Sequence, residues 1–280
     1  MADAPRAFVA GHPIGHSRSP LIHGAWLMRY GIDGSYSAID VPPEEFRALT
    51  VALRAGEWIG GNVTIPHKET AFNLVDRRDA AAEAIGAVNT LWLENGVLVG
   101  GNTDAFGFAA NLDQRLQGWR DGQTALVLGA GGASRAVIHA LLEAGYSRID
   151  IVNRTVERAD QLATRFGQKT AAYGWDAVGT LLKSADLIIN TTSLGMHGQP
   201  PLVLDLADVR PDAMATDIVY VPLETPFLKL AGEAGLRTAD GLGMLLHQAA
   251  PGFSHWFGIW PDVDDTLRDL VIADLNKAHS

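Results

Sequence analysis

A glycine-rich turn between an apolar strand and an apolar helix constrains the fold of this chain more than any other feature. We predict the strand over residues 124–128 and the helix over 135–144, and between them stands Gly129-Ala130-Gly131-Gly132-Ala133-Ser134. Glycines permit a tight turn and a close backbone approach, and the N–H groups that begin a helix can bind a pyrophosphate. In this strand–turn–helix context the motif predicts a dinucleotide-binding unit more than an ordinary turn.

The residues after the next strand indicate which dinucleotide binds. We predict that strand over residues 149–152, and Asn153-Arg154-Thr155 follows it, with Arg158 one turn into the next helix. An NAD-binding unit usually has an acidic residue at this point, which holds the ribose 2′-hydroxyl. A carboxylate would repel a 2′-phosphate, whereas a guanidinium pairs with it. The segment therefore favours NADP, and the alternative is that both arginines are solvated surface side chains.

Composition excludes several classes of protein. The 280 residues suggest two domains or one large one, and 22 Lys and Arg against 32 Asp and Glu give a net charge of −10. This acidic balance argues against a partner that is nucleic acid or an anionic membrane. The absence of cysteine excludes disulfides and thiolate metal sites, and no histidine cluster completes a ligand set, so we predict no metal. Because we find neither a signal peptide nor an apolar run of membrane-spanning length, we expect a cytoplasmic protein.

Strands and helices alternate along the first hundred residues, which predicts a mostly parallel α/β sheet. The strands are expected at 6–10, 35–41, 58–63, 87–92 and 97–100, with helices at 21–30 and from Pro42 to Arg54. A second unit begins near Asp121, and beyond its glycine-rich turn we expect a helix at 155–166 and strands at 187–190, 215–219 and 236–239. The residues after Gly252 are predicted to be helical and to return to the first domain.

Four polar clusters lie beside strands of the first domain. They are His16-Ser17-Arg18-Ser19-Pro20, Asn62-Val63-Thr64-Ile65-Pro66-His67-Lys68, Asn89-Thr90 and Gly101-Asn102-Thr103-Asp104. Singly, each has an ordinary explanation, such as a helix cap or a solvated lysine. The carboxyl ends of parallel strands share one edge, however, so all four clusters could converge on one crevice. Their hydroxyl, amide, ammonium and carboxylate groups suit a small polyhydroxylated acid.

With these motifs in view, the sequence resembles the shikimate dehydrogenases over nearly its whole length. The resemblance rests on eight motifs in the family's order: G-H-P-I-G-H-S-R-S-P from Gly11, N-V-T-I-P-H-K from Asn62, G-A-V-N-T from Gly86, G-N-T-D from Gly101, G-A-G-G-A-S-R-A from Gly129, N-R-T from Asn153, N-T-T-S-L-G-M from Asn190 and D-G-L-G-M-L-L-H-Q from Asp240. Two departures are Gly24 after His23, where the family often has asparagine, and Ala80, where some members have an acidic cofactor contact.

The resemblance implies a two-domain α/β enzyme that reversibly oxidises shikimate to 3-dehydroshikimate with NADP. Residues 1–104 and about 249–280 would form a mostly parallel α/β substrate domain, about 105–248 a Rossmann-like NADP-binding domain, and the active-site crevice would lie between them. It implies a small-molecule substrate, no nucleic-acid or membrane partner, and a monomer or homodimer.

Residue by residue, the resemblance implies the following roles. The substrate would contact Ser17, Ser19, Thr64, Lys68, Asn89, Asp104, Tyr220 and Gln248, with Lys68 and Asp104 as the catalytic pair. The cofactor would contact Gly129, Ala130, Gly131, Gly132, Ala133, Asn153, Arg154, Thr155, Arg158, Ile218 and Gly241.

Two questions stay open at this point. Lys68 could accept the hydroxyl proton, or it could act as a cationic donor while Asp104 accepts that proton. The activity could also be that of a relative that uses quinate, NAD or an aminoshikimate. Besides shikimate dehydrogenase and these relatives, the chain could be a cofactor-sensing regulator without catalysis. Such a regulator would have no need of Lys68, Asp104 and a full set of substrate-type groups.

Overall fold

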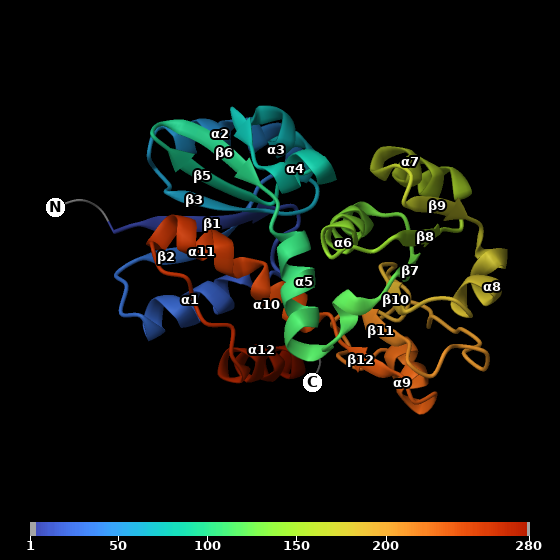
Figure 1. The fold of residues 1–280 in the computed structure, drawn as a ribbon. Helices are drawn as coiled ribbons and strands as arrows, with labels where there is room; N and C mark the ends of the chain where they lie inside the picture. Colours follow the sequence, from blue (N-terminus) through green and yellow to red (C-terminus); the bar gives the residue numbers. More distant parts are fainter. Residues whose placement is uncertain (1–3, 279–280) are drawn as a thin grey trace. The chain divides into compact units, whose positions relative to one another are not determined.

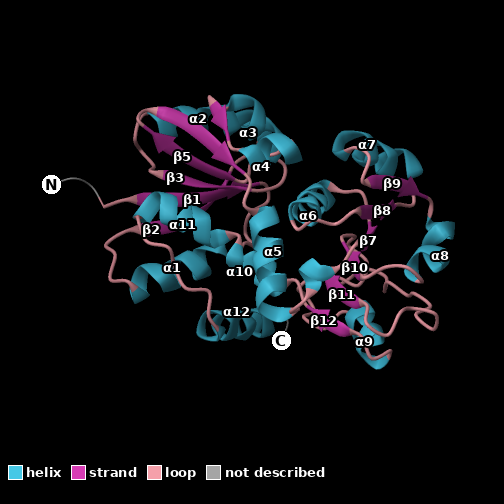
Figure 2. Cartoon of the chain, in the orientation of Figure 1, coloured by secondary structure: helices cyan, strands magenta, loops and turns pink. Residues whose placement is uncertain are grey.

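A computed structural model describes residues 4–278 of the chain, which divide into two compact units. The first unit comprises Met1–Thr103 and Gln248–Ser280, and the second comprises Asp104–His247. Each unit contains one six-stranded sheet with helices packed around it (Figures 1 and 2). The predicted α/β class is thereby confirmed.

The sheet of the first unit is mixed. Its strands lie in the order β2-β1-β3-β5-β6-β4, with bounds β1 Arg6–Gly11, β2 Ser35–Asp40, β3 Gly60–Val63, β4 Arg77–Arg78, β5 Thr90–Glu94 and β6 Val97–Gly101. β1 pairs with β2 and β3 in parallel, and β4 pairs with β6 in parallel. β5, however, runs antiparallel to both β3 and β6. The expected mostly parallel sheet is therefore interrupted by the short β5–β6 hairpin, whose turn is at Asn95 and Gly96.

Helices of the first unit bury the apolar faces of this sheet. They are α1 Ser19–Arg29, α2 Phe46–Arg54, α3 Lys68–Leu74, α4 Ala80–Ile85, α11 Ala249–Phe257 and α12 Asp265–Ala278. α11 packs against β5 and β3, and α12 packs against α1. α1 begins at Ser19, two residues before its predicted start, because Pro20 fits the first turn of a helix, where no backbone N–H is required.

An aromatic cluster joins α1, β2 and α11. The ring of His23 stacks on Tyr36 at 3.9 Å between centroids and lies 5.5 Å from the ring of Trp256. Trp26 packs edge-on against Phe253 at 5.3 Å. Complete burial lowers the pKa of His23 to about 3, an effect that the nearby side chain of Asn62 offsets only in part. His23 is therefore a neutral core side chain at physiological pH.

The sheet of the second unit is parallel throughout. Its strands lie in the order β12-β11-β10-β7-β8-β9, with bounds β7 Thr124–Leu128, β8 Arg148–Val152, β9 Thr170–Tyr173, β10 Leu187–Asn190, β11 Met214–Asp217 and β12 Arg237–Ala239. The sequence analysis located β7 and β10 at their observed bounds but missed β9. Because β9 is an edge strand of four half-buried residues, it lacks the apolar run that marks the central strands.

The helices of the second unit are α5 Asp104–Arg115, α6 Gly132–Glu143, α7 Val156–Phe166, α8 Val178–Leu182, α9 Pro226–Glu233 and α10 Leu242–His247. α5 packs against α10 and α6. α6 begins at Gly132, inside the glycine-rich turn rather than after it, so the glycines themselves form the start of the helix.

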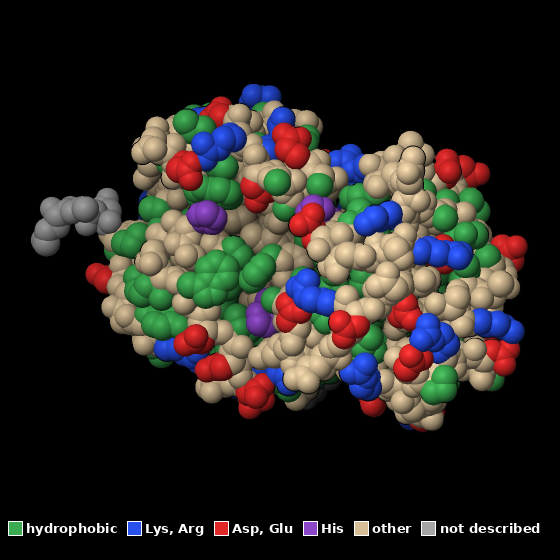
Figure 3. All heavy atoms as spheres, in the orientation of Figure 1, with side chains coloured by type: hydrophobic (Ala, Val, Ile, Leu, Met, Phe, Trp, Pro, Cys, Tyr) green, Lys and Arg blue, Asp and Glu red, His purple; other side chains and the backbone are tan. Residues whose placement is uncertain are grey.

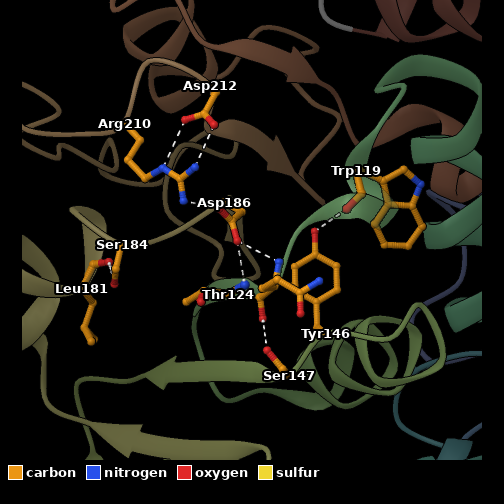
Figure 4. Close-up of polar contacts among 10 residues, drawn as sticks. Trp119, Thr124, Tyr146, Ser147, Leu181, Ser184, Asp186, Arg210 and Asp212 are labelled. Atoms are coloured by element: carbon orange, nitrogen blue, oxygen red, sulfur yellow. Dashed lines mark hydrogen bonds and ion pairs between the residues drawn. The ribbon is translucent and has the colours of Figure 1, made fainter.

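A cluster of hydrogen bonds and ion pairs around Asp186 links the amino ends of β7 and β10 (Figure 4). One carboxylate oxygen of Asp186 accepts hydrogen bonds from the backbone N–H groups of Gln123 and Thr124, both at 2.8 Å. The other oxygen pairs with the guanidinium of Arg210 at 2.5 Å, and Arg210 also pairs with Asp212. This cluster lies at the edge of the sheet opposite to the glycine-rich turn, where it serves stability.

Replacing Asp186 with alanine should therefore destabilise the second unit without changing ligand binding. Loss of two charge-assisted bonds to the backbone is expected to cost about 2 kcal/mol, measured as a lower urea midpoint. Asp212→Ala is the matched control, because that carboxylate is exposed and bonds no other strand, and its midpoint should stay near that of the parent. Equal midpoints for the two variants would show that Asp186 does not fasten the strands.

Candidate functional site

The strand register of the first unit places its polar clusters at one edge of the sheet. Val63 at the end of β3 is level with Ala10 near the end of β1, and Thr90 at the start of β5 is level with Asn62 and Gly101. Because β5 is antiparallel to β3 and β6, the first residue of β5 is level with the last residues of these two strands. The strand ends next to these clusters therefore lie at one edge of the sheet, although Asn89-Thr90 stands at a strand start and not at a strand end.

The loop after β1 carries Ser17 and Ser19. The hydroxyl of Ser17 accepts a hydrogen bond from the N–H of Ser19 at 3.3 Å, and Ser19 is the first, buried residue of α1. Between them, the Nε of Arg18 pairs with a carboxylate oxygen of Asp274 on α12 at 2.7 Å. The C-terminal helix thereby holds the serine loop in place, a contact that the sequence analysis missed.

Thr64 and Lys68 lie on the turn between β3 and α3. The N–H of Thr64 donates to the carbonyl of Ala10 at 2.9 Å, and its carbonyl accepts from the N–H of His67. Lys68 is the first residue of α3, and its carbonyl accepts from the N–H of Val88 at 3.0 Å. His67 is buried against Phe46, with 4.5 Å between ring centroids. We therefore assign this histidine to the packing of the turn and not to the reaction.

Asn89 stands immediately before β5 and is 2% exposed. Its side-chain oxygen accepts from the N–H of Thr103 at 2.9 Å and from the hydroxyl of Thr90 at 2.9 Å. Its side-chain nitrogen lies 3.4 Å from the Oε1 of Gln248, the residue that precedes α11. The structure thus brings together Asn89 and Gln248, two of the predicted substrate residues.

The remaining substrate candidates belong to the second unit. Asp104 is the first residue of α5 and directly follows Thr103 in the chain, and Tyr220 lies half-buried in the loop after β11.

A hydrogen-bonded chain fixes the glycine-rich turn of the second unit. The N–H of Gly131 donates to the hydroxyl of Ser134 at 3.0 Å, which lies 2.7 Å from the hydroxyl of Thr191. Thr191 donates to the carbonyl of Leu128 at 2.8 Å, so Ser134 must be the donor to Thr191. Gly129 has φ +112°, a conformation that favours glycine. The glycine-rich turn is therefore preformed, and it leads into the start of α6, where backbone N–H groups can bind a pyrophosphate.

The segment after β8 is attached to this turn through Asn153. The Oδ1 of Asn153 accepts from the N–H of Ala130 at 3.2 Å, and its Nδ2 donates to the carbonyl of Thr155 at 2.8 Å. Arg154 and Arg158 are exposed beside it. Two exposed cationic side chains therefore belong to the segment that Asn153 attaches to the turn.

Ile218 and Gly241 approach each other at the carboxyl end of β11. A Cβ on Gly241 would lie 2.4 Å from the carbonyl oxygen of Ile218, so only glycine fits there. The sequence analysis missed Asp217, whose buried carboxylate accepts from Asn190 at 3.0 Å, from the N–H of Val219 at 2.9 Å and from the hydroxyl of Thr225 at 2.8 Å. Burial raises the pKa of Asp217, while these hydrogen bonds oppose the rise.

Among residues 4–278, no group of three or more histidine, aspartate and glutamate side chains is arranged to hold a metal ion. Within the same residues, no helix is both long and apolar enough to cross a membrane. On the face seen in Figure 3, basic and acidic side chains are interspersed.

Three protein-family models match the chain. They are described as the shikimate dehydrogenase substrate binding domain, over residues 9–91, shikimate/quinate 5-dehydrogenase, over 111–197, and the shikimate 5′-dehydrogenase C-terminal domain, over 241–268. Together they span both units and include the glycine-rich turn and most of the polar clusters.

Similar proteins agree with these matches. The chain is 60% identical to the shikimate dehydrogenase (NADP(+)) of Mesorhizobium japonicum, over 96% of both chains. It is 58% identical to the enzyme of the same name from Brucella melitensis, over 99% of this chain and 97% of the other. A crystal structure of shikimate 5-dehydrogenase from Thermus thermophilus, in complex with NADP(H) and shikimate, superposes with a TM-score of 0.83 at 38% identity, over 95% of this chain and 99% of the other. On the motifs, the fold and these likenesses, the chain belongs to the shikimate dehydrogenase family.

Proposed function

We propose that the chain catalyses the reversible, NADP-dependent oxidation of shikimate to 3-dehydroshikimate, which in the reductive direction serves the biosynthesis of chorismate and the aromatic amino acids. The observation that carries this proposal is the edge of the first sheet, where polar residues follow β1 and β3 and where Asn89 stands directly before the antiparallel β5. Relatives at 58% and 60% identity that carry the name shikimate dehydrogenase (NADP(+)) support it.

The second unit fits NADP. A Cβ built on Gly131 or on Gly132 meets no atom within 4 Å, so the backbone there is open to a closely approaching group. The pyrophosphate would lie along residues 129–133 at the start of α6, and Asn153, Thr155 and the exposed Arg154 and Arg158 would hold the adenosine ribose with its 2′-phosphate. Ile218 and Gly241 would contact the nicotinamide end.

The first unit supplies most of the substrate groups in this proposal. The hydroxyls of Ser17 and Ser19 would hold the substrate carboxylate, and the family resemblance assigns Tyr220 of the second unit to the same group. Thr64, Asn89 and Gln248 hold the ring hydroxyls. Since the side chain of Asn89 is fixed by several buried hydrogen bonds, this part of the site is organised before substrate arrives, which lowers the entropic cost of orienting the substrate.

Oxidation of the alcohol removes a hydride from the carbinol carbon and a proton from its oxygen. Bound NADP supplies the acceptor for the hydride. We assign the proton to Lys68, with Asp104 as its partner in the catalytic pair. Lys68 is held at the first turn of α3, whose backbone is bonded to Val88 next to Asn89. The backbone of Lys68 therefore has a fixed place relative to Asn89, which binds the ring in this proposal.

Replacing Lys68 with methionine should lower kcat by about 10²-fold or more, because proton transfer loses its catalyst. KM for shikimate should change little, since most ring contacts remain. Initial rates of NADP reduction measure both constants. The matched control is Lys183→Met, which removes an exposed lysine paired only with Asp208 and should leave kcat unchanged. A near-normal kcat in the Lys68 variant would remove this residue from the mechanism.

Replacing Arg154 with alanine should raise KM for NADP and leave KM for NAD nearly unchanged, since only NADP carries the 2′-phosphate. Steady-state kinetics with both cofactors would measure the split. Arg165→Ala, which removes an exposed arginine at the far end of α7, is the control and should change neither constant. If both KM values rise equally in the Arg154 variant, Arg154 acts on structure and not on the phosphate.

Alanine substitutions at two glycines of the turn should have different effects, one on cofactor binding and the other on thermal stability. An alanine at Gly131 has room in the protein, so Gly131→Ala should keep the parent's Tm but raise KM for NADP by about tenfold or more, because the new methyl group occupies the approach of the pyrophosphate. At Gly129 the Cβ would lie 2.7 Å from the hydroxyl of Thr191 at a positive φ, so Gly129→Ala should lower Tm. Unchanged cofactor binding in Gly131→Ala would place the pyrophosphate elsewhere.

Shikimate and quinate differ for the site mainly in one additional hydroxyl on quinate. Quinate presents the same carboxylate and most of the same ring oxygens. We propose a cytoplasmic enzyme with preference for shikimate and NADP, acting as a monomer or homodimer. Rates with shikimate and quinate, each measured against NADP and NAD, test the preference. A strong rate with quinate or NAD would assign the chain to the dual-specificity branch, and no rate in any combination would favour a cofactor-sensing regulator.

A further inference from the structure

We propose that Thr90 is a positioning residue for the substrate, because its buried hydroxyl, together with the backbone N–H of Thr103, holds the Asn89 amide with its nitrogen toward the ring. This inference rests on the proposed contact between Asn89 and the substrate and adds a residue that acts through Asn89. Thr90 is the first residue of β5 and has no solvent exposure, so it orients a binding group without touching the ligand.

The hydroxyl of Thr90 joins two amide side chains. It accepts a hydrogen bond from the Nδ2 of Asn62 at 3.1 Å and donates one to the Oδ1 of Asn89 at 2.9 Å. A hydroxyl has one proton to donate, so giving it to Asn89 leaves the lone pairs for Asn62. The second hydrogen of the Asn62 amide group is taken by the backbone carbonyl of Asn89, also at 3.1 Å.

These contacts set the direction of the Asn89 amide. Its oxygen receives the hydroxyl of Thr90, and from Thr103 it receives the backbone N–H at 2.9 Å and the hydroxyl at 3.2 Å. Three donors therefore converge on one buried oxygen. The reversed amide would point its N–H groups at the backbone N–H of Thr103, which can only donate, and this is unfavourable for a buried group. The Nδ2 consequently lies on the side of Gln248, and Asn89 meets the substrate as a hydrogen-bond donor.

Valine at position 90 would remove one of these three donors while keeping the shape of the side chain. A methyl group cannot approach an oxygen as closely as the 2.9 Å that separates the Thr90 hydroxyl from Asn89, so the amide would be displaced as well as released. Serine would retain the hydroxyl and both of its hydrogen bonds. Valine and serine thus differ in the property that the proposal invokes.

The test compares Thr90→Val and Thr90→Ser by steady-state kinetics and thermal unfolding of the full chain. Thr90→Val should raise KM for shikimate about five- to tenfold, the effect of one misplaced hydrogen bond, with KM for NADP unchanged. Thr90→Ser should stay within about twofold of the parent. Thr50→Val is the matched control, because the buried Thr50 hydroxyl donates only to the Arg47 carbonyl within α2, and its KM values should not change. If Thr90→Val does not fold, Thr90→Ala removes the same hydroxyl without introducing the methyl group.

Asn89→Ala separates this inference from the function on which it rests. If Asn89→Ala impairs shikimate binding while Thr90→Val and Thr90→Ala behave like the parent, the positioning role is wrong and the site assignment stands. If Asn89→Ala itself leaves KM and kcat for shikimate unchanged, the site assignment fails. An equal rise of both KM values in Thr90→Val, without rescue by serine, would show that Thr90 has only a structural role.

Discussion

The hydrogen bonds of Asn89 are the interactions on which the candidate site depends. Its backbone N–H donates to Gly101 on β6, and its carbonyl accepts from Val63 on β3, so one residue links three strands where they reach the same edge. Its side chain is then held by Thr90 and Thr103. Chain direction, strand pairing and the orientation of a binding group are thereby determined together. A site built in this way needs little rearrangement to receive a ligand, which is the physical meaning of preorganisation.

The sequence was sufficient for features that rest on local chemistry. A buried apolar run followed by glycines gave β7 and the turn at Gly129, and polar residues that interrupt apolar runs gave the candidate clusters. Such patterns are legible because apolar strands and glycine turns have strict local requirements. The family resemblance supplied the reaction and the cofactor, and it named individual site residues whose roles remain predictions.

Features that depend on pairing between distant residues could not be predicted from the sequence. Nothing near Thr90 shows that β5 runs antiparallel, since direction is set by the short hairpin and by partners on other strands. The acceptor role of Asp217 and the link between Arg18 and Asp274 need residues that are distant in sequence. The edge strand β9 lacks an apolar run of its own. In each case the determining contact is tertiary, so a local pattern could not reveal it.

The neutral histidine in the aromatic cluster makes the first unit vulnerable to acid. Unfolded, His23 would bind a proton below its ordinary pKa of about 6.5, whereas in the fold it does so only near pH 3. Between these values the unfolded chain carries the additional proton, so each step toward lower pH favours unfolding. The rings of Tyr36 and Trp256 pack on that imidazole, and Tyr36 is also bonded to Asn62. Acid would therefore loosen the first unit at this aromatic cluster, which Tyr36 links to Asn62 on β3.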